Sequence, residues 1–237
     1  MTRSEQATAL LLLIAAGAPP LLFPVSQAGY ASMDKLGLWV LVPAVVLFFL
    51  LFFWTYLLRM NLLLNRVQAG AAAGLLATGG LEVVRAISFH FGGMPGNLPE
   101  LLGVLLTGRI MEGPSLMTDL AGWGYHFWNG LCFGVIYVLV LGRKNAWVGI
   151  LYGVVIGLIF LASPAVSGLG IGFMGVDMPS MPITVVLAHL VFGSILGVLS
   201  RRWLWDGQGI LFFTTPQSPT NKQTLSVKDK FTGGPSC

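Results

Sequence analysis

Two histidines begin the same spacing pattern in this sequence. The segments YHFWNGLCFG (125–134) and AHLVFGSILG (188–197) both read His-x3-Gly-x3-Gly, starting at His126 and His189. The chain has only three histidines, and both segments are strongly apolar. Because an ionisable side chain is costly inside a membrane-spanning stretch, its presence there usually marks a function.

A carboxylate joins these histidines as a candidate for chemistry. Glu82 lies on a third apolar segment, at a depth similar to that of both histidines, and His90 lies at the outer end of that segment. Two imidazoles and a carboxylate from three helices can bind a metal ion, and two imidazoles alone can ligate haem. His126 and His189 are therefore candidate ligands of copper or haem b, with Glu82 and His90 as further candidates.

Two other interpretations of these residues remain open. In the first, each histidine hydrogen-bonds a carbonyl or hydroxyl of a neighbouring helix, and Glu82 neutralises Arg85, which follows it by about one helical turn. In the second, the carboxylate belongs to a path for protons or a solute. The first interpretation is favoured, because nothing in the spacing is as specific as a zinc-finger pattern.

Methionines give a weaker indication of metal chemistry. The segment MGVDMPSM carries Met174, Met178 and Met181 around Asp177. Thioether sulfur favours Cu(I), which would suit copper handling on the outer side of the membrane. Methionine is also an adaptable packing residue, and we favour this role.

Recognised catalytic motifs are absent from the sequence. It lacks His-Glu-x-x-His, a phosphate-binding loop, Gly-x-Ser-x-Gly and the Cys-x-x-Cys-His of covalent haem. The match SMDK (32–35) to Ser-x-x-Lys is short and has no companion motif. The chain is therefore predicted not to be an enzyme.

The composition indicates a chain that folds in lipid. Of its 237 residues, 55% are hydrophobic and 9% charged, whereas a soluble domain carries about a quarter charged residues. Apolar runs predict about six transmembrane helices in an all-α fold. They cover residues 7–25, 37–58, 67–89, 121–141, 145–163 and 182–200. Prolines interrupt the first run, for which a cleaved signal peptide is the alternative.

Lysine and arginine predict the orientation of these spans. With six spans, the basic residues at 59–66, 143–144 and 201–202 all face one side, together with Arg3. Basic loops stay in the cytoplasm, so we expect both termini there, in a bacterial inner membrane. The net charge of +4 is thus explained by the basic residues of the cytoplasmic loops. The expected partners are the lipid bilayer and other membrane subunits, not nucleic acid.

Small residues at every fourth position form four rows, here termed stripes, each on one face of a predicted helix. Such faces let helices approach closely in membranes, so we expect these helices to form the core. The glycines are Gly70, Gly74, Gly130, Gly134, Gly149, Gly153, Gly157, Gly193 and Gly197. Extended at the same spacing, three stripes reach Glu82, His126 and His189, which places these side chains on packed faces.

The chain is predicted to have three parts. Residues 1–65 hold two N-terminal spans that are peripheral to the bundle, residues 66–205 form the membrane core, and residues 206–237 are a polar cytoplasmic tail. Within the core, GNLPELLGVLLTGR (96–109) predicts a short helix that cannot cross the membrane. We expect it on the outer side, at the interface or against the bundle.

Four motifs along the core occur in a recognisable order. They are GAAAGLLATGGLE, HFWNGLCFGVIY, GILYG and HLVFGSILG. This order resembles that of small multispanning bacterial membrane proteins of the YagU-like type, over residues 66–202. The resemblance implies a multispanning membrane protein and assigns no activity.

These observations favour a non-catalytic integral membrane subunit, or accessory protein, of a larger membrane complex such as a respiratory or redox complex. Two apolar outer segments support this hypothesis, because irregular apolar backbone needs cover by protein. One alternative is a metal- or haem-binding membrane protein that uses His126 and His189. The other is a small proton-linked transporter that uses Glu82.

Overall fold

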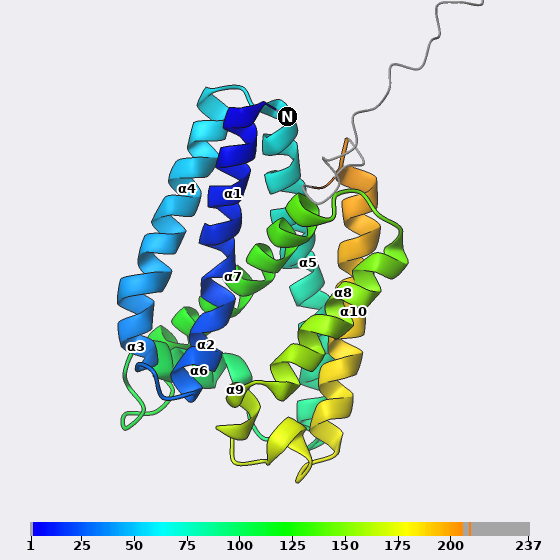
Figure 1. The fold of residues 1–237 in the computed structure, drawn as a ribbon. Coiled ribbons are helices and arrows are strands. Elements are labelled where there is room, and N and C mark those ends of the chain that lie inside the picture. The colour runs from blue at the N-terminus through cyan, green and yellow to red at the C-terminus, as the bar shows by residue number, and fades with distance from the viewer. Residues whose placement is uncertain (1, 206–208, 210–237) are drawn as a thin grey trace, which may run out of the picture.

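The computed structural model describes residues 2–205 and residue 209. The regular elements among these residues are all helical (Figure 1). The all-α prediction is therefore confirmed for the part of the chain that the structure describes. Apart from residue 209, the predicted tail at 206–237 lies outside the described residues.

Prolines modify the first span, as predicted. The helix α1 (Arg3–Gly17) passes through a 3-10 turn, η1 (Pro19–Leu21), into α2 (Leu22–Gln27). Because Pro19 and Pro20 have no N–H to continue the α-helical hydrogen bonds, the helix changes to the tighter turn at this point. The three pieces together remain long and apolar enough to cross a membrane.

The second span contains a widened turn. It consists of α3 (Met33–Leu36), η2 (Gly37–Leu41) and α4 (Val42–Leu57). The η2 segment is a π turn, in which the first N–H of α4 donates to the first carbonyl of η2, five residues earlier. Pro43 follows immediately, and its bulky ring and missing N–H explain why the turn is wider there.

Four further long helices follow. They are α5 (Asn61–His90), α7 (Leu116–Val140), α8 (Ala146–Ala162) and α10 (Ser180–Trp203). Shorter elements lie between them, namely α6 (Leu98–Leu106), α9 (Pro164–Ser167) and η3 (Phe173–Gly175). Each predicted span is thus helical, and most of the helices extend a few residues beyond the predicted bounds.

Among the described residues, four helical stretches are long and apolar enough to cross a membrane. They are Arg3–Gln27, Met33–Leu57, α5 and α10. The helix α8 is apolar but has only 17 residues. The helix α7 carries three polar side chains, Asp119, His126 and Asn129, which lower its mean hydropathy.

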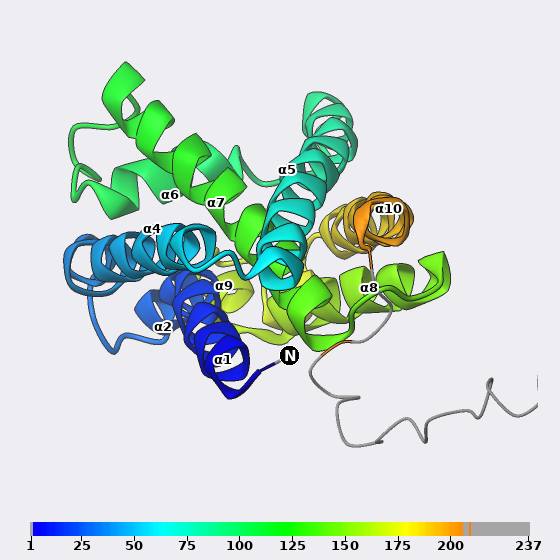
Figure 2. The same cartoon turned by 90° about the horizontal axis from the view of Figure 1, so that it is seen from above.

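The long helices pack in an order that differs from their order in the chain (Figures 1 and 2). α7 packs against α1 and against α5, α5 packs against α10, and α10 packs against α8. The helix α4 lies beside α1, and α6 lies on α7. This order leaves α1 and α8 on the same side of the molecule (Figures 1 and 2).

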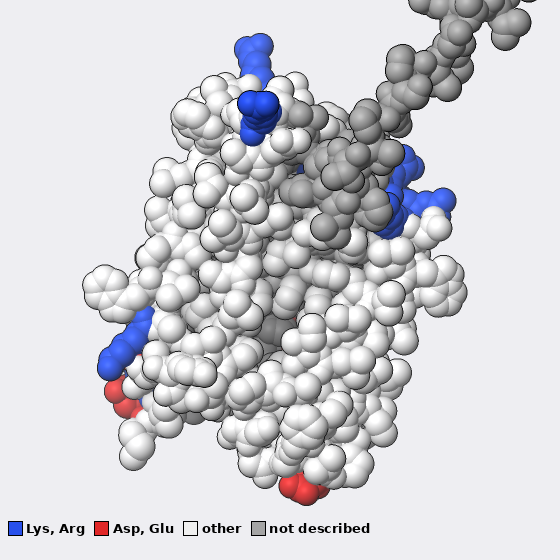
Figure 3. All heavy atoms as spheres, in the orientation of Figure 1, with Lys and Arg blue, Asp and Glu red and all other residues white. Residues whose placement is uncertain are grey.

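The two ends of the bundle differ in charge (Figure 3). One end, termed the basic end, carries the short connections after α4 and α7 and the end of α10. Its charged side chains include Arg3, Arg59, Arg143, Lys144, Arg201 and Arg202. The opposite end, termed the loop end, carries Asp34, Glu100, Glu112, Asp119 and Asp177, together with Lys35 and Arg109.

The first span is not peripheral, so this part of the prediction is wrong. Ala9, Leu12 and Ala16 of α1 are completely buried in a core cluster with side chains of α5 and α7. Their small size and their position on one face let α1 approach α7 closely. The second span does match the prediction, because Phe49 and Trp54 of α4 are at least half exposed.

The predicted outer helix corresponds to α6, and it packs against the bundle. Gly103 of α6 faces Gly122 of α7, and a Cβ added to either would clash with the backbone of the other helix. The preceding residue, Asn97, is the N-cap of α6, but its side chain makes no capping hydrogen bond. That side chain is used elsewhere, in the polar cluster described next.

Candidate functional site

The glycine stripes meet in two antiparallel helix pairs, α5–α7 and α8–α10. In the first pair, Gly74 lies against Gly130 and Gly134. In the second pair, Gly149 lies against Gly193 and Gly197. A Cβ added at any of the nine stripe glycines would lie within 3.0 Å of an atom of the facing helix. Both pairs therefore depend on residues without a side chain at the contact.

Beyond the glycine contacts, toward the loop end, each helix pair carries one of the two candidate histidines. In α5–α7, Glu82 faces His126, and the histidine Nε2 lies 2.8 Å from the glutamate Oε1. In α8–α10, the position equivalent to Glu82 is Gly157, on which the His189 ring packs. The two histidines thus occupy equivalent positions but have different partners.

Glu82 and Arg85 form a buried ion pair, as the structural interpretation predicted. The arginine Nε donates to both carboxylate oxygens at 2.9 Å, and Nη2 donates to Oε2 at 2.6 Å. The two side chains are 9% and 6% exposed. Burying such a pair is favourable only when further polar contacts satisfy it.

Three neighbours extend this ion pair into a larger group, here termed the polar cluster (Glu82, Arg85, Asn97, Glu100 and His126). Arg85 Nη2 also donates to Asn97 Oδ1 at 3.0 Å, and the Asn97 amide in turn donates to Glu100. The Trp123 ring lies 5.9 Å from Arg85 Cζ, in the range of a cation–π contact. The cluster therefore joins α5, α6 and α7.

Some polar atoms around the cluster have no hydrogen-bond partner among the described residues. These atoms include Arg85 Nη1 and Asn129 Oδ1. His126 Nε2 is close enough to Glu82 for an ion pair, but its direction is outside that of a hydrogen bond. A small rotation of the imidazole would align it. Arg85 Nη1 has no such contact within reach.

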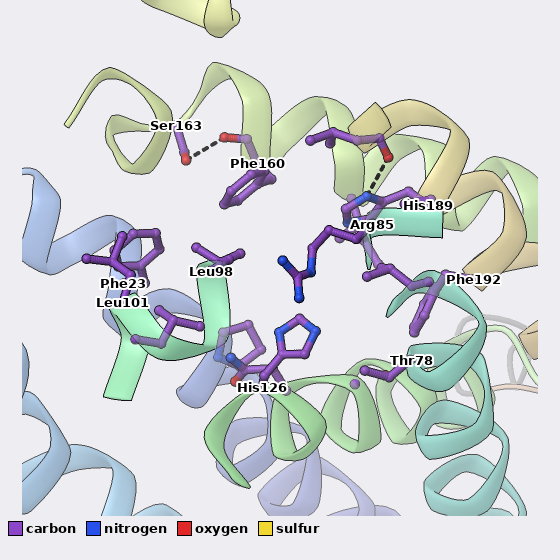
Figure 4. Close-up of a pocket in the computed structure, with 18 of the residues that line it drawn as sticks. Phe23, Thr78, Arg85, Leu98, Leu101, His126, Phe160, Ser163, His189 and Phe192 are labelled. Carbon is purple, nitrogen blue, oxygen red and sulfur yellow. Dashed lines mark hydrogen bonds between the residues drawn. The ribbon is translucent and has the colours of Figure 1, made fainter. Parts of the chain in front are cut away.

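A cavity of about 590 Å³ lies beside the polar cluster. Figure 4 shows Arg85 pointing into it, with Phe23, Leu98 and Phe160 around the far side. Its lining residues come from both N-terminal and C-terminal parts of the chain, and include Leu81, Met94, Asn129, Phe133, Ile156 and Ala188. Most of this surface is apolar, and Arg85, His126 and Asn129 are among its few polar lining residues.

The cavity reaches the side of the molecule between α2 and α8. Two of its lining residues, Leu21 and Ile159, are 60% and 65% exposed on the outer surface of the bundle. Figure 3 shows the hollow on this face, at mid-height between the two ends. Tyr125 holds the proline-rich edge in place by donating to the Pro19 carbonyl at 2.7 Å.

His189 lies on the cavity wall opposite His126, and Arg85 reaches into the space between the two rings (Figure 4). His189 Nδ1 lies 2.8 Å from the Val185 carbonyl of its own helix. His189 therefore bonds a carbonyl of its own helix, whereas the prediction was a carbonyl or hydroxyl of a neighbouring helix.

This arrangement does not fit a shared copper or haem b site. The guanidinium of Arg85 would place a positive charge beside any cation bound between His126 and His189. Among the described residues, no group of three His, Cys, Asp or Glu side chains is positioned to hold a metal ion. Glu82, the predicted third ligand, is instead committed to Arg85 and His126.

The other predicted metal ligands lie away from the polar cluster. His90 is exposed at the end of α5, where its ring contacts Phe91. Met174, Met178 and Met181 pack in an apolar cluster with Leu161, Val166 and Val185. Met181 is buried, and this packing role is the one the sequence favoured.

Three residues of the site were not identified as functional from the sequence. Asn97 lies in the segment that predicted a short helix, and neither it nor Trp123 was assigned a functional role. Asn129 had no assigned role, although it lies three residues after His126 and so shares its helix face. That spacing is the signal that could have identified Asn129. Asn97 reaches Arg85 only through the fold of the loop before α6.

Comparison of the chain with models of known protein families, with curated proteins and with solved structures gave no match.

Proposed function

We propose that the chain is a six-span protein of the bacterial inner membrane, with both termini in the cytoplasm. The four helices long and apolar enough to span, together with α7 and α8, supply these six crossings. The collection of arginines at the basic end supports this orientation, because basic loops are retained in the cytoplasm. The four Gly-striped helices α5, α7, α8 and α10 form its core, with α6 as the short outer helix.

Within this bundle, the cavity binds an amphipathic molecule that enters from the lipid phase. The observation that carries this proposal is a laterally open cavity with mostly apolar walls and an unpartnered guanidinium nitrogen on Arg85. Its volume of about 590 Å³ lies within the range of about 300–1,000 Å³ that is typical of small-molecule sites. The protein itself supplies no group to the free donor of Arg85, whereas a ligand can.

Lateral entry follows from the position of the opening. The rim residues Leu21 and Ile159 belong to the outer, lipid-facing surface of the bundle, and the hollow opens on the side of the bundle (Figure 3). A molecule dissolved in the bilayer reaches such an opening without crossing either interface. Water-soluble molecules would have to pass through the hydrocarbon first, which is costly for polar solutes.

This function is non-catalytic, and it agrees with an accessory role in a larger membrane complex. The exposed aromatic face of α4 is the surface through which we expect a partner subunit to bind, although lipid covers such a face equally well. The proton-linked transporter remains the alternative. Its specific support is the contact of 2.8 Å between His126 and Glu82 at the cavity.

The test uses cysteine accessibility in lipid vesicles. Ala188→Cys places a thiol on the cavity wall, and Leu187→Cys places one on the lipid-facing side of the same helix. In a Cys237→Ser background, native Cys132 is the internal control, because it is completely buried. Each variant is treated with N-dodecylmaleimide and with a membrane-impermeant sulfonated maleimide.

We expect the lipid-soluble reagent to label both Ala188→Cys and Leu187→Cys, and the charged reagent to label neither. Cys132 should remain unlabelled by both reagents. Labelling of Ala188→Cys by the charged reagent would show a water-filled cavity and contradict lateral entry. Failure of both reagents at Ala188→Cys, with normal labelling at Leu187→Cys, would show that lipid-phase molecules do not enter.

A further inference from the structure

The polar end of the bound molecule is constrained by Arg85. Nε and Nη2 of this side chain already donate to Glu82 and Asn97, whereas Nη1 donates to nothing among the described residues. A guanidinium keeps its charge in proteins and has donors only, so Nη1 needs an acceptor. Arg85 is 5% exposed and lines the cavity, so an acceptor for Nη1 has to lie inside the cavity.

A second unpaired group shares the cavity with Arg85. Asn129 Oδ1 is buried without a hydrogen-bond partner, and Asn129 also lines the cavity. The two groups do not satisfy one another, although one is a donor and the other an acceptor. An oxygen acceptor on a bound head group would satisfy Arg85 Nη1. A hydroxyl on the same head group would also donate to Asn129 Oδ1.

The charges around Arg85 favour a neutral head group over an anion. Glu82 and Arg85 cancel one another, and Glu100 adds a negative charge through Asn97, so with a neutral His126 the polar cluster is negative overall. A carboxylate or phosphate bound here would leave excess negative charge beside apolar walls. Burying an uncompensated charge costs far more than burying a neutral carbonyl that accepts a hydrogen bond.

The remaining walls fit an apolar body. Phe23, Phe160 and Phe192 line the cavity with Leu98 and Leu101 (Figure 4). Flat aromatic faces of this kind pack against rings and against alkyl chains. Phe23, Leu98 and Phe160 lie across the cavity from Arg85 (Figure 4), on the side that carries the rim residues Leu21 and Ile159, so the apolar part of the ligand would extend from Arg85 toward them.

Resting on the proposed function, we infer that the ligand is a neutral, lipid-soluble molecule whose carbonyl or hydroxyl oxygen accepts a hydrogen bond from Arg85 Nη1. Quinones and monoacylglycerols are molecules of this class. Asn129 is the second polar contact, and the apolar body occupies the aromatic part of the cavity. Arg85 thus acts as a binding residue, held in position by Glu82 and Asn97.

The test measures how well four probes protect Ala188→Cys from N-dodecylmaleimide in vesicles. The probes are decylubiquinone, 1-decanoylglycerol, decanoate and decane, each given as its mole fraction in the lipid. A charged hydrogen-bond donor favours a ligand with an oxygen acceptor over one without it by roughly 10- to 100-fold in affinity. Decylubiquinone and 1-decanoylglycerol should therefore protect at mole fractions at least about 10-fold lower than those that decane and decanoate require.

A variant separates recognition by Arg85 from simple occupancy. Glu82→Gln combined with Arg85→Met removes the donor and leaves no unpaired charge, so the preference for oxygen-containing probes should disappear while decane protects as before. Ser163→Ala is the matched control, because it removes a hydroxyl from the cavity wall whose hydrogen bonds are to Phe160 and Ala165 and not to Arg85. It should keep the preference.

Each other outcome has a definite meaning. Strongest protection by decanoate would overturn the neutral head group and leave lateral binding intact. Equal protection by all four probes, or an unchanged preference in the double variant, would overturn recognition by Arg85. Absence of protection by every probe, with Ala188→Cys still reactive, would overturn the proposed function itself.

Discussion

The two glycine-mediated helix pairs have nearly the same backbone arrangement and different chemistry. In each pair one helix, α7 or α10, carries the pattern His-x3-Gly-x3-Gly. The two glycines of this pattern face glycines or other small residues that lie one turn apart on the antiparallel helix, α5 or α8. The histidine of each pair faces the position one turn further along. That position is Glu82 in α5–α7 and Gly157 in α8–α10.

This single difference separates a polar cluster from a packing contact. Opposite Glu82, His126 becomes part of a network with Arg85 and Asn97. Opposite Gly157, His189 has no side-chain partner from the facing stripe and bonds a carbonyl of its own helix. Repeated small residues therefore build the contact, and the residue at the end of the stripe decides its chemistry.

The largest expected effect comes from breaking the polar pair. Glu82→Ala leaves Arg85 buried without its counter-charge, and removing one partner of a buried ion pair costs about 3–5 kcal/mol. Denaturant unfolding in mixed micelles measures the free energy of unfolding. The double variant Glu82→Ala/Arg85→Ala should recover much of the loss. A cost below about 1 kcal/mol for Glu82→Ala would show that the pair is hydrated.

Alanine at the glycine contacts tests the feature that the pairs share. Gly74→Ala and Gly193→Ala each place a Cβ against the backbone of the facing helix. Overpacking of this kind costs about 1–3 kcal/mol in unfolding free energy, and we expect the two pairs to be similarly sensitive. Gly79→Ala is the control on α5, because no atom lies within 4 Å of its added Cβ. Equal stability of all three variants would contradict close helix contact.

Disturbing the contact between Gly157 and His189 should lower the free energy of unfolding by less, and the two positions should be energetically coupled. A Cβ at position 157 would lie 2.9 Å from His189 Cγ, so Gly157→Ala should cost about 1 kcal/mol. His189→Ala makes room for that Cβ. In a double-mutant cycle on unfolding free energy, the pair should therefore be coupled by about 0.5–2 kcal/mol. Additive costs would place the ring away from Gly157.

The smallest effects should come from the single substitution of either histidine. His126→Ala and His189→Ala each remove one polar contact, which costs about 1 kcal/mol. Because the two side chains have separate partners, the unfolding costs should add within about 0.5 kcal/mol. Metal analysis and a visible absorption spectrum of the purified protein accompany this measurement. A bound metal or haem that is lost in either variant would restore the shared-ligand hypothesis.

Several features of the fold follow from local sequence. The apolar runs predicted helices at every expected position, and the prolines of the first run predicted its interruption, which the structure places at Pro19–Leu21. The pairing of Glu82 with Arg85 was also predictable, because residues three apart lie on one helix face. The burial of α1 was not, since its leucine-rich composition resembles that of α4 and only its alanine face distinguishes it.

What the sequence by itself determined is the helical membrane character of the chain and the faces on which its glycines and ionisable residues lie. Periodicity carries this information, because a helix fixes which side chains share a face. Only the tertiary structure decided which stripe meets which, that Asn97 reaches Arg85, and that a cavity remains between the helix pairs. These are contacts between residues distant in sequence, and they depend on how side-chain volumes from several helices fit together, which no local pattern encodes.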